Sequence, residues 1–304
     1  MNIIGRGLLG VTDRKFFRKL ITETAPGRAL SQRFVAGETL EQAIHTAYAL
    51  NEKGAMVSLD HLGEHVTDRA QAEAARDDYL ACLDAIGEHG IDGNISVKLS
   101  QLGMGFDDEL AGESLDALAE RAAAAGTTVS VDMEESAVTS VTIDLYGTAQ
   151  RKRGNLGLAV QAYLHRTVQD LDTIMPLGGH VRLCKGAYAE PEDVAFQSRG
   201  EVNAAFDRLT HLLMGDDRVK PAIASHDADR LEVARGLAGA RTGPFEYQML
   251  YGVRTTLQDE MLSRGEPLRI YVPYGVAWYP YLTRRMAERP ANIAFFLRAA
   301  LSRG

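Results

Sequence analysis

Short apolar runs rich in β-branched residues recur along the chain, and longer segments with helical spacing separate them. The helical segments include 68–86, 114–125, 192–214 and 228–237, which are rich in Ala, Leu, Glu and Arg. Strand-like runs start roughly 25–40 residues apart, which predicts βα repeats and a parallel sheet. The expected strands are 55–59, 95–99, 128–133, 156–162, 181–184, 222–225, 245–250 and 269–272.

Eight βα units predict an α/β protein with the fold of a (β/α)8 barrel, which they match better than an open sheet. The length of 304 residues fits this fold once an N-terminal helical arm, residues 1–40, is set aside. The barrel would then span residues 41–304. No low-complexity tract or composition break indicates a further domain.

The bulk composition excludes several classes of protein. A net charge of -8 argues against a nucleic-acid binder, because such a protein needs a basic face. Cys82 and Cys184 form no CxxC pair, so the sequence predicts no disulfide framework and no zinc site of that type. No span reaches the roughly 18 consecutive apolar residues of a membrane helix.

The first six expected strands run into polar or ionisable residues, at the end where barrel enzymes carry their chemistry. Lys98 follows the second strand and suits either a Schiff-base nucleophile or a cation paired with an acid. Asp132 ends the next strand and is a candidate partner for Lys98. Glu134 and Glu135 follow it, and they are better explained as acids at a helix N-terminus.

The fifth expected strand carries VRLCKGAY, residues 181–188. Arg182 interrupts an otherwise apolar strand, which is costly unless it meets a bound anion, an aromatic ring or an internal Asp. Lys185 and Gly186 follow at the strand end, where glycine allows a ligand to approach the backbone closely.

The sixth and seventh strands add further candidates. His226 and Asp227 suit a zinc ligand pair or a hydrogen bond to a cofactor. Glu246 and Gln248 share one face of the seventh strand, with Leu250 as an apolar wall.

Residues 271–288 read YVPYGVAWYPYLTRRMAE and carry adjacent arginines at 284 and 285. Arg284 and Arg285 beside a strand end suit a carboxylate or phosphate, and Glu288 lies one turn after Arg284. An ordinary solvated charged face is the alternative. With Lys98 and Arg182, the cations favour an anionic small substrate and a phosphate-bearing cofactor.

Taken together and in order, VKLS, VDMEE, VRLCKGAY, ASHD, FEYQML and YVPYG…WYPYLTRRMAERP resemble the proline dehydrogenase family. The likeness runs from roughly residue 40 to the C-terminus and is to the bacterial form without an aldehyde dehydrogenase domain. It implies a distorted (β/α)8 barrel that binds FAD and oxidises L-proline to Δ1-pyrroline-5-carboxylate by hydride transfer to flavin N5.

The same resemblance implies that the reduced flavin passes its electrons to a membrane quinone. It therefore implies a cytoplasmic protein at the inner face of the cytoplasmic membrane. A separate pyrroline-5-carboxylate dehydrogenase would be its partner.

The resemblance also assigns roles to residues. For the substrate, Arg284 and Arg285 would clamp the carboxylate with support from Glu288, and Lys98, beside Asp132, would contribute to carboxylate binding. Tyr188, Leu250 and Tyr271 would pack on the ring, and Glu64 would pair with a clamp arginine to gate the pocket. For the cofactor, Arg182 would lie near flavin N5, and the other contacts would be Gln161, Lys185, Gly186, Tyr188, His226, Glu246 and Gln248.

Two other functions fit part of the pattern. A Schiff-base lyase or aldolase would use Lys98 or Lys185 as nucleophile and bind no flavin. A barrel that only binds an anionic metabolite is disfavoured, because burying several ions without a ligand or catalytic role is costly.

Overall fold

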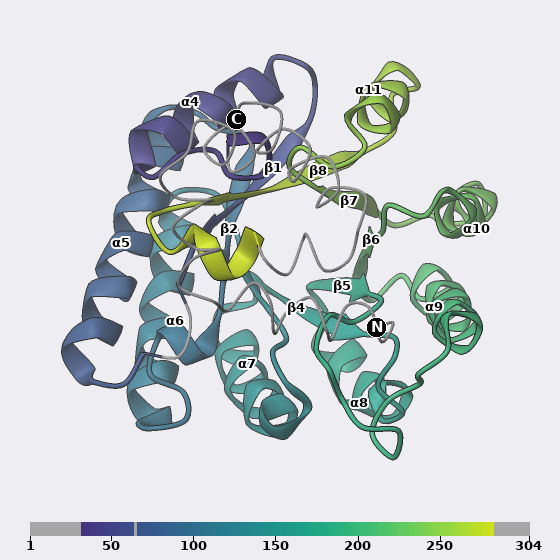
Figure 1. Cartoon of the computed structure of the whole chain (residues 1–304), viewed down its shortest axis with the longest axis horizontal. Helices are drawn as coiled ribbons and strands as arrows, with labels where there is room; N and C mark the ends of the chain where they lie inside the picture. Colours follow the sequence, from purple (N-terminus) through teal and green to yellow (C-terminus); the bar gives the residue numbers. More distant parts are fainter. Residues whose placement is uncertain (1–31, 64–65, 283–304) are drawn as a thin grey trace, which may run out of the picture.

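Eight parallel strands close into a barrel in which each strand pairs with the next in sequence and β8 pairs with β1 (Figure 1). The computed structural model describes residues 32–63 and 66–282. The predicted (β/α)8 fold is confirmed. The strands are β1 Met56–His61, β2 Gly93–Val97, β3 Val129–Val131, β4 Leu156–Gln161, β5 His180–Cys184, β6 Lys220–Ala224, β7 Glu246–Leu250 and β8 Leu268–Tyr274.

Helices surround the barrel and connect consecutive strands (Figure 1). The helix α4 precedes β1 and starts at a capping box formed by Thr39 and Gln42. The predicted arm, residues 1–40, lies mostly outside the described residues, so the division of the chain at residue 40 stays a prediction. The helices are α4 Leu40–Asn51, α5 Arg69–Glu88, α6 Asp108–Ala124, α7 Thr139–Arg153, α8 Thr167–Ile174, α9 Arg199–Met214, α10 Ala228–Ala238 and α11 Thr255–Ser263.

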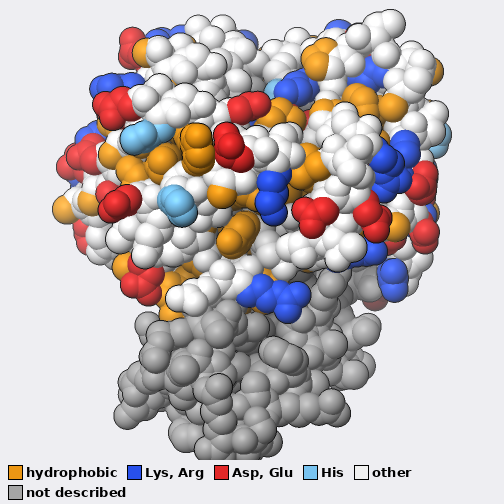
Figure 2. All heavy atoms as spheres, turned by 90° about the horizontal axis from the view of Figure 1, so that it is seen from above, with side chains coloured by type: hydrophobic (Ala, Val, Ile, Leu, Met, Phe, Trp, Pro, Cys, Tyr) orange, Lys and Arg blue, Asp and Glu red, His pale blue; other side chains and the backbone are white. Residues whose placement is uncertain are grey.

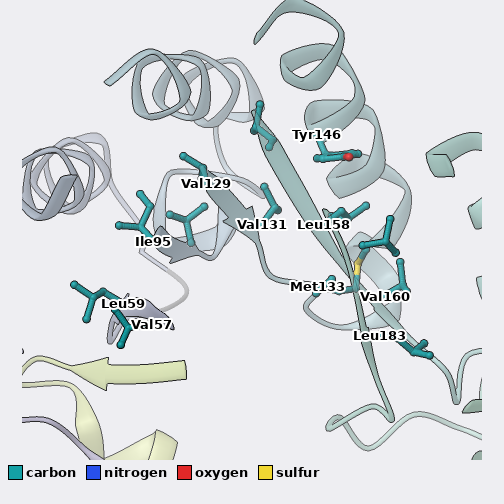
Figure 3. Close-up of a cluster of buried hydrophobic side chains, with 14 of the residues drawn as sticks. Val57, Leu59, Ile95, Val129, Val131, Met133, Tyr146, Leu158, Val160 and Leu183 are labelled. Atoms are coloured by element: carbon teal, nitrogen blue, oxygen red, sulfur yellow. The ribbon is translucent and has the colours of Figure 1, made fainter. Parts of the chain in front are cut away.

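Alternation along the strands separates an apolar core from a polar barrel interior. Val57 and Leu59 of β1, like Val129 and Val131 of β3, belong to one buried cluster with residues such as Tyr146 of α7 (Figure 3). The residues between them in sequence point to the opposite face, into the barrel. That inner face carries Ser58, Asp60, Ser96, Ser130 and Arg182, all of them buried. A polar interior of this kind leaves room for chemistry that a barrel packed with Val and Leu would not.

Two of the expected helices start elsewhere in the structure. The helix expected from residue 192 starts at Arg199, because Ser198 and Glu201 form a capping box there. The residues before it form a loop that pairs Ala195 with Leu164. The helix expected from residue 114 starts earlier, at Asp108, where the Asp107 side chain accepts a hydrogen bond from Leu110 N.

An ion pair fills the opposite end of the barrel, where β7 and β8 begin. Arg269 donates to both carboxylate oxygens of Glu246, at 2.7 and 3.2 Å, and to Val57 O at 2.8 Å. Lys220 Nζ lies 3.0 Å from Glu246 Oε2. Burial alone would raise the pKa of Glu246, but Arg269 with its neighbours holds it below its ordinary value. Glu246 is therefore an interior anion.

The surface drawn in Figure 2 intersperses acidic and basic side chains and shows no broad basic patch. Within the described part of the chain, no helix has the length and hydropathy to span a membrane.

Candidate functional site

A cavity of about 640 Å³ lies at the carboxyl ends of the strands, a volume typical of small-molecule sites. Residues on or directly after every strand line it, from Asp60 of β1 to Tyr271 of β8. The structure thus brings together most of the residues singled out in the sequence. Those in the lining are Lys98, Asp132, Gln161, Arg182, Lys185, Gly186, Tyr188, His226, Gln248, Leu250 and Tyr271.

Two acids and two cations form a cluster at the base of this cavity. Lys98 Nζ lies 3.0 Å from Asp60 Oδ1 and 3.3 Å from Asp132 Oδ2. Arg182 forms an ion pair with the other oxygen of Asp132. The predicted pairing of Lys98 with Asp132 is present, and the cluster carries no net charge.

The cluster fixes the charge of its members. Burial favours the neutral amine, but Asp60 and Asp132 raise the pKa of Lys98 above its ordinary value. Burial would also raise the pKa of Asp132, yet Lys98 and Arg182 lower it below its ordinary value. Lys98 is therefore a fixed ammonium cation and Asp132 a fixed carboxylate. A protonated amine is a poor nucleophile, which argues against Lys98 in a Schiff-base mechanism.

Arg182 is held across the barrel by serines and a tyrosine ring. Its guanidinium donates to Ser130 Oγ at 2.8 Å and to Ser96 Oγ at 3.1 Å, and it lies 5.3 Å from the centre of the Tyr271 ring. The Arg182 Nε atom is buried and has no hydrogen-bond partner among the described residues. The internal salt bridge considered from sequence is present, and the same guanidinium also lines the cavity.

Tyr271 joins the cluster through its hydroxyl, which donates to Asp132 Oδ2 at 2.8 Å. Burial and the neighbouring Asp132 raise the pKa of Tyr271 well above its ordinary value. Tyr271 is therefore a neutral hydrogen-bond donor that presents an aromatic wall to the cavity.

A second group of cations lies on the β5 to β7 side. Lys185 Nζ donates to Asp227 Oδ2 at 2.7 Å and to Asn203 Oδ1 at 2.6 Å. Arg199 and Arg254 also line the cavity, although the sequence patterns did not indicate either of them. Arg254 adopts a left-handed backbone with φ of 53°, and its guanidinium donates to His226 O at 2.7 Å.

Gly186 lines the cavity, and its backbone conformation requires glycine. Its φ is +117°, and a Cβ there would lie 2.2 Å from the Tyr163 ring. The predicted role of this glycine in close backbone approach stays a prediction, and the geometry requires glycine on steric grounds.

Of the two acids after Asp132, Glu135 lies directly before the short 3-10 helix Ser136–Val138, whereas Glu134 has a different role. Glu134 is buried and accepts a hydrogen bond from Ser100 N at 3.0 Å, while its backbone oxygen accepts one from Gln161 Nε2 at 2.9 Å. Interpreting Glu134 as a helix-terminus acid was wrong, because it ties the β2 and β3 ends together instead.

A zinc site is not supported. The described residues contain no group of three or more His, Cys, Asp and Glu side chains suited to a metal. His226 Nε2 instead accepts a hydrogen bond from Leu250 N at 2.9 Å, which positions the ring beside the β7 end.

Glu246 lies outside the cavity lining, and the structure therefore does not support its predicted cofactor contact. Glu246 is the first residue of β7 and lies below the lining, where its Oε1 accepts a hydrogen bond from the cavity residue Gln248 at 2.7 Å. Glu64, Arg284, Arg285 and Glu288 lie outside the described residues.

Asp60 and Tyr281 are cavity residues that the sequence interpretation missed as site candidates. Asp60 was visible as a polar strand tip, but nothing in the sequence showed that it faces Lys98. Tyr281 precedes the arginine pair by a few residues, and aromatic spacing alone did not single it out.

Comparisons with known proteins indicate the family of this chain. The family model for proline dehydrogenase matches residues 43–298. Proline dehydrogenase 1 of Bacillus subtilis subsp. natto is 36% identical over 276 residues, which cover 90% of this chain and 91% of that protein. Proline dehydrogenase of Deinococcus radiodurans is 35% identical over 287 residues, which cover 90% of this chain and 90% of that protein.

A solved structure supports the fold. The chain superposes on proline utilization A (PutA) from Bdellovibrio bacteriovorus, inactivated by N-propargylglycine, with a TM-score of 0.83. The match has 18% identity and covers 97% of this chain and 37% of that larger one. The family model and the curated relatives show that the chain belongs to the proline dehydrogenase family.

Proposed function

We propose that the chain oxidises L-proline to Δ1-pyrroline-5-carboxylate in the cavity at the strand ends, with FAD as cofactor. Family membership makes the chain an oxidoreductase of proline catabolism. The observation that carries the finer proposal is the buried cluster of Lys98, Asp132 and Arg182 inside that cavity. Such a cluster holds fixed charges where a small zwitterion could bind and react.

The donors around the cavity fit a flavin dinucleotide. Arg182 offers a buried Nε that has no hydrogen-bond partner within residues 32–63 and 66–282, and a cation near the flavin ring stabilises the negative charge of its reduced form. Lys185, Arg199 and Arg254 supply cations on the β5 to β7 side that suit a phosphate group. When bound, the flavin would accept the hydride that leaves the proline ring carbon next to nitrogen. Gln161, Gly186, His226 and Gln248 complete the proposed cofactor contacts.

The substrate would be held by charge at one end and by shape at the other. Lys98, as a fixed ammonium, would bind the proline carboxylate together with Arg284 and Arg285, with Glu288 as their support. Tyr188, Leu250 and Tyr271 would pack on the ring, since all three line the cavity. Glu64 is proposed to pair with a clamp arginine and so to close the pocket.

The proline nitrogen must be unprotonated before hydride leaves the adjacent carbon. Tyr271 and Lys98 are proton donors in this cluster, because the pKa of each is raised. Asp132 accepts from Lys98, Arg182 and Tyr271 already. We therefore infer that the substrate amine loses its proton to solvent, so kcat/KM should rise with pH as free proline is deprotonated.

Electron transfer and partners are proposed from the family likeness. The reduced flavin would pass its electrons to a membrane quinone, with the chain acting at the inner face of the cytoplasmic membrane. The product would go to a separate pyrroline-5-carboxylate dehydrogenase.

The visible absorption spectrum of the purified protein tests cofactor and substrate together. Oxidised-flavin bands that bleach on anaerobic addition of L-proline would support the proposal. Flavin bands that do not change on addition of L-proline would refute the assignment of proline as the substrate. If the protein binds no flavin even after incubation with FAD, the assignment of FAD as cofactor is refuted. Borohydride trapping of a keto substrate on a lysine would then favour a lysine-based lyase.

A further inference from the structure

Asp60 is a buried carboxylate at the carboxyl end of β1 and has no assigned role. Its side chain is buried, lines the cavity and accepts a hydrogen bond from Lys98 Nζ at 3.0 Å through Oδ1. Its other oxygen, Oδ2, is buried and has no hydrogen-bond partner among the described residues. A buried carboxylate is costly, and the pair with Lys98 is what compensates for its burial.

The two acids that flank Lys98 differ in how much else they bind. Asp132 accepts from Arg182, Ser96 and Tyr271 as well as from Lys98. Asp60 is closer to Lys98 Nζ, at 3.0 Å against 3.3 Å for Asp132. Among the described residues, Lys98 is therefore the one hydrogen-bond partner of the Asp60 side chain, whereas Asp132 has several.

The position of the ammonium group follows from this asymmetry. Asp60 lies on β1, and Asp132 comes directly after β3. These two strands flank β2 in the barrel. Lys98 directly follows β2, so the two acids hold its Nζ between them at the base of the cavity. Without the Asp60 charge, the ammonium would be drawn toward Asp132, whose other carboxylate oxygen already pairs with Arg182. Burial would also act more strongly against its charge.

We propose that Asp60 is a positioning residue of the reaction, which holds the Lys98 ammonium group on the β1 side of the cavity, where it binds the substrate carboxylate. The inference rests on the proposed function, because it takes Lys98 as a contact of the proline carboxylate. Asp60 acts through Lys98 and need not touch the substrate.

The test compares three variants of the FAD-loaded enzyme: Asp60→Asn, Lys98→Met and the double variant. Rapid-mixing measurements of flavin reduction give the apparent proline dissociation constant and the limiting rate separately. Asp60→Asn should weaken proline binding about 10-fold, with the limiting rate changed by less than about threefold. The double variant should behave like Lys98→Met alone, because Asp60 has no other route to the substrate.

Glu266→Gln is the matched control. Glu266 forms a half-buried bidentate pair with Arg235, with both hydrogen bonds at 2.9 Å, and lies outside the cavity lining. It should lower the midpoint of thermal unfolding and leave proline binding unchanged. Thermal unfolding and bound flavin are measured for every variant, so that general damage is separated from positioning.

The pH dependence of proline binding gives a readout that a purely structural role would not move. The charged and titratable groups around Lys98 are Asp60 on β1, Asp132 and Glu134 after β3, Arg182 on β5 and Tyr271 on β8. Removing the Asp60 charge should shift the alkaline loss of proline binding to lower pH, since a carboxylate that favours the protonated amine is gone.

Unchanged proline binding in Asp60→Asn, or losses that add in the double variant, would overturn the proposal. If Asp60→Asn does not fold, Asp60→Glu carries the test. It moves the same charge by one methylene, and weaker proline binding at an unchanged limiting rate is expected, whereas unchanged binding would overturn the inference. A wild-type enzyme that proline does not reduce would instead contradict the proposed function.

Discussion

Arg182 and Arg269 offer a matched pair of buried arginines, of which one alone faces the cavity. Their exposed fractions are 5% and 6%, and each pairs with a buried acid, Asp132 and Glu246 respectively. Removing one partner of a buried ion pair costs about 3–5 kcal/mol, because the other charge is left uncompensated. Arg182→Met and Arg269→Met should therefore lower the free energy of unfolding by similar amounts, measured by denaturant titration of the FAD-loaded proteins.

The two variants should differ in the reaction. Loss of a preorganised cation beside developing negative charge costs about 100- to 1,000-fold in rate. Arg182→Met should slow flavin reduction by about 100-fold and weaken proline binding by less, whereas Arg269→Met should leave both within about threefold. Rapid anaerobic mixing with L-proline measures both quantities. Slowing as severe in Arg269→Met, or a binding defect in Arg182→Met larger than its rate defect, would refute the proposed place of Arg182 near the flavin.

Three further predictions address other parts of the molecule. Burial lowers the pKa of His180 from 6.5 to about 4, so the unfolded chain binds more protons between these values, and stability should fall by on the order of 2–3 kcal/mol as pH decreases through that window. His180→Gln should flatten this slope in denaturant titrations, and an unchanged slope would contradict the assignment. Gly186→Ala should reduce bound flavin, because its Cβ would overlap the Tyr163 ring, and full flavin content would refute this. Arg284→Met should raise KM for proline by a factor equivalent to about 2–4 kcal/mol of lost binding free energy, with flavin still bound. Unchanged kinetics would refute the proposed binding of the proline carboxylate by Arg284.

The fold was largely predictable because strand spacing and polar strand tips are local properties of the sequence. The predicted strands all occur, with starts shifted by a few residues. The start of α9 was mispredicted, because helix-forming composition extends upstream of the capping box at Ser198 that sets its start. Composition shows where a helix is favourable, whereas a cap determines where it begins.

Site residues were predictable where their chemistry is unusual for their position, as for Arg182 inside an apolar strand. The same reasoning applies to Arg269 at the start of the eighth expected strand, and it would have predicted a buried partner without identifying Glu246. Which end of the barrel a side chain occupies depends on its position along the strand. Glu246 begins β7 and Leu250 ends it, so the same strand supplies one interior anion and one cavity wall. The partnership of Asp60 with Lys98 required the closed barrel itself, because 38 positions separate them in sequence.

The central claim is that proline is oxidised in this cavity by hydride transfer from Cδ, the CH2 carbon of the ring next to nitrogen. Rapid anaerobic mixing of the FAD-loaded enzyme with L-proline, either unlabelled or deuterated at that carbon, tests it most directly. The account predicts loss of the oxidised-flavin bands, a slower loss with the deuterated substrate, and Δ1-pyrroline-5-carboxylate as the product found by mass spectrometry. Flavin that stays oxidised with saturating L-proline, or a product that retains both deuterium atoms at that carbon, would contradict it.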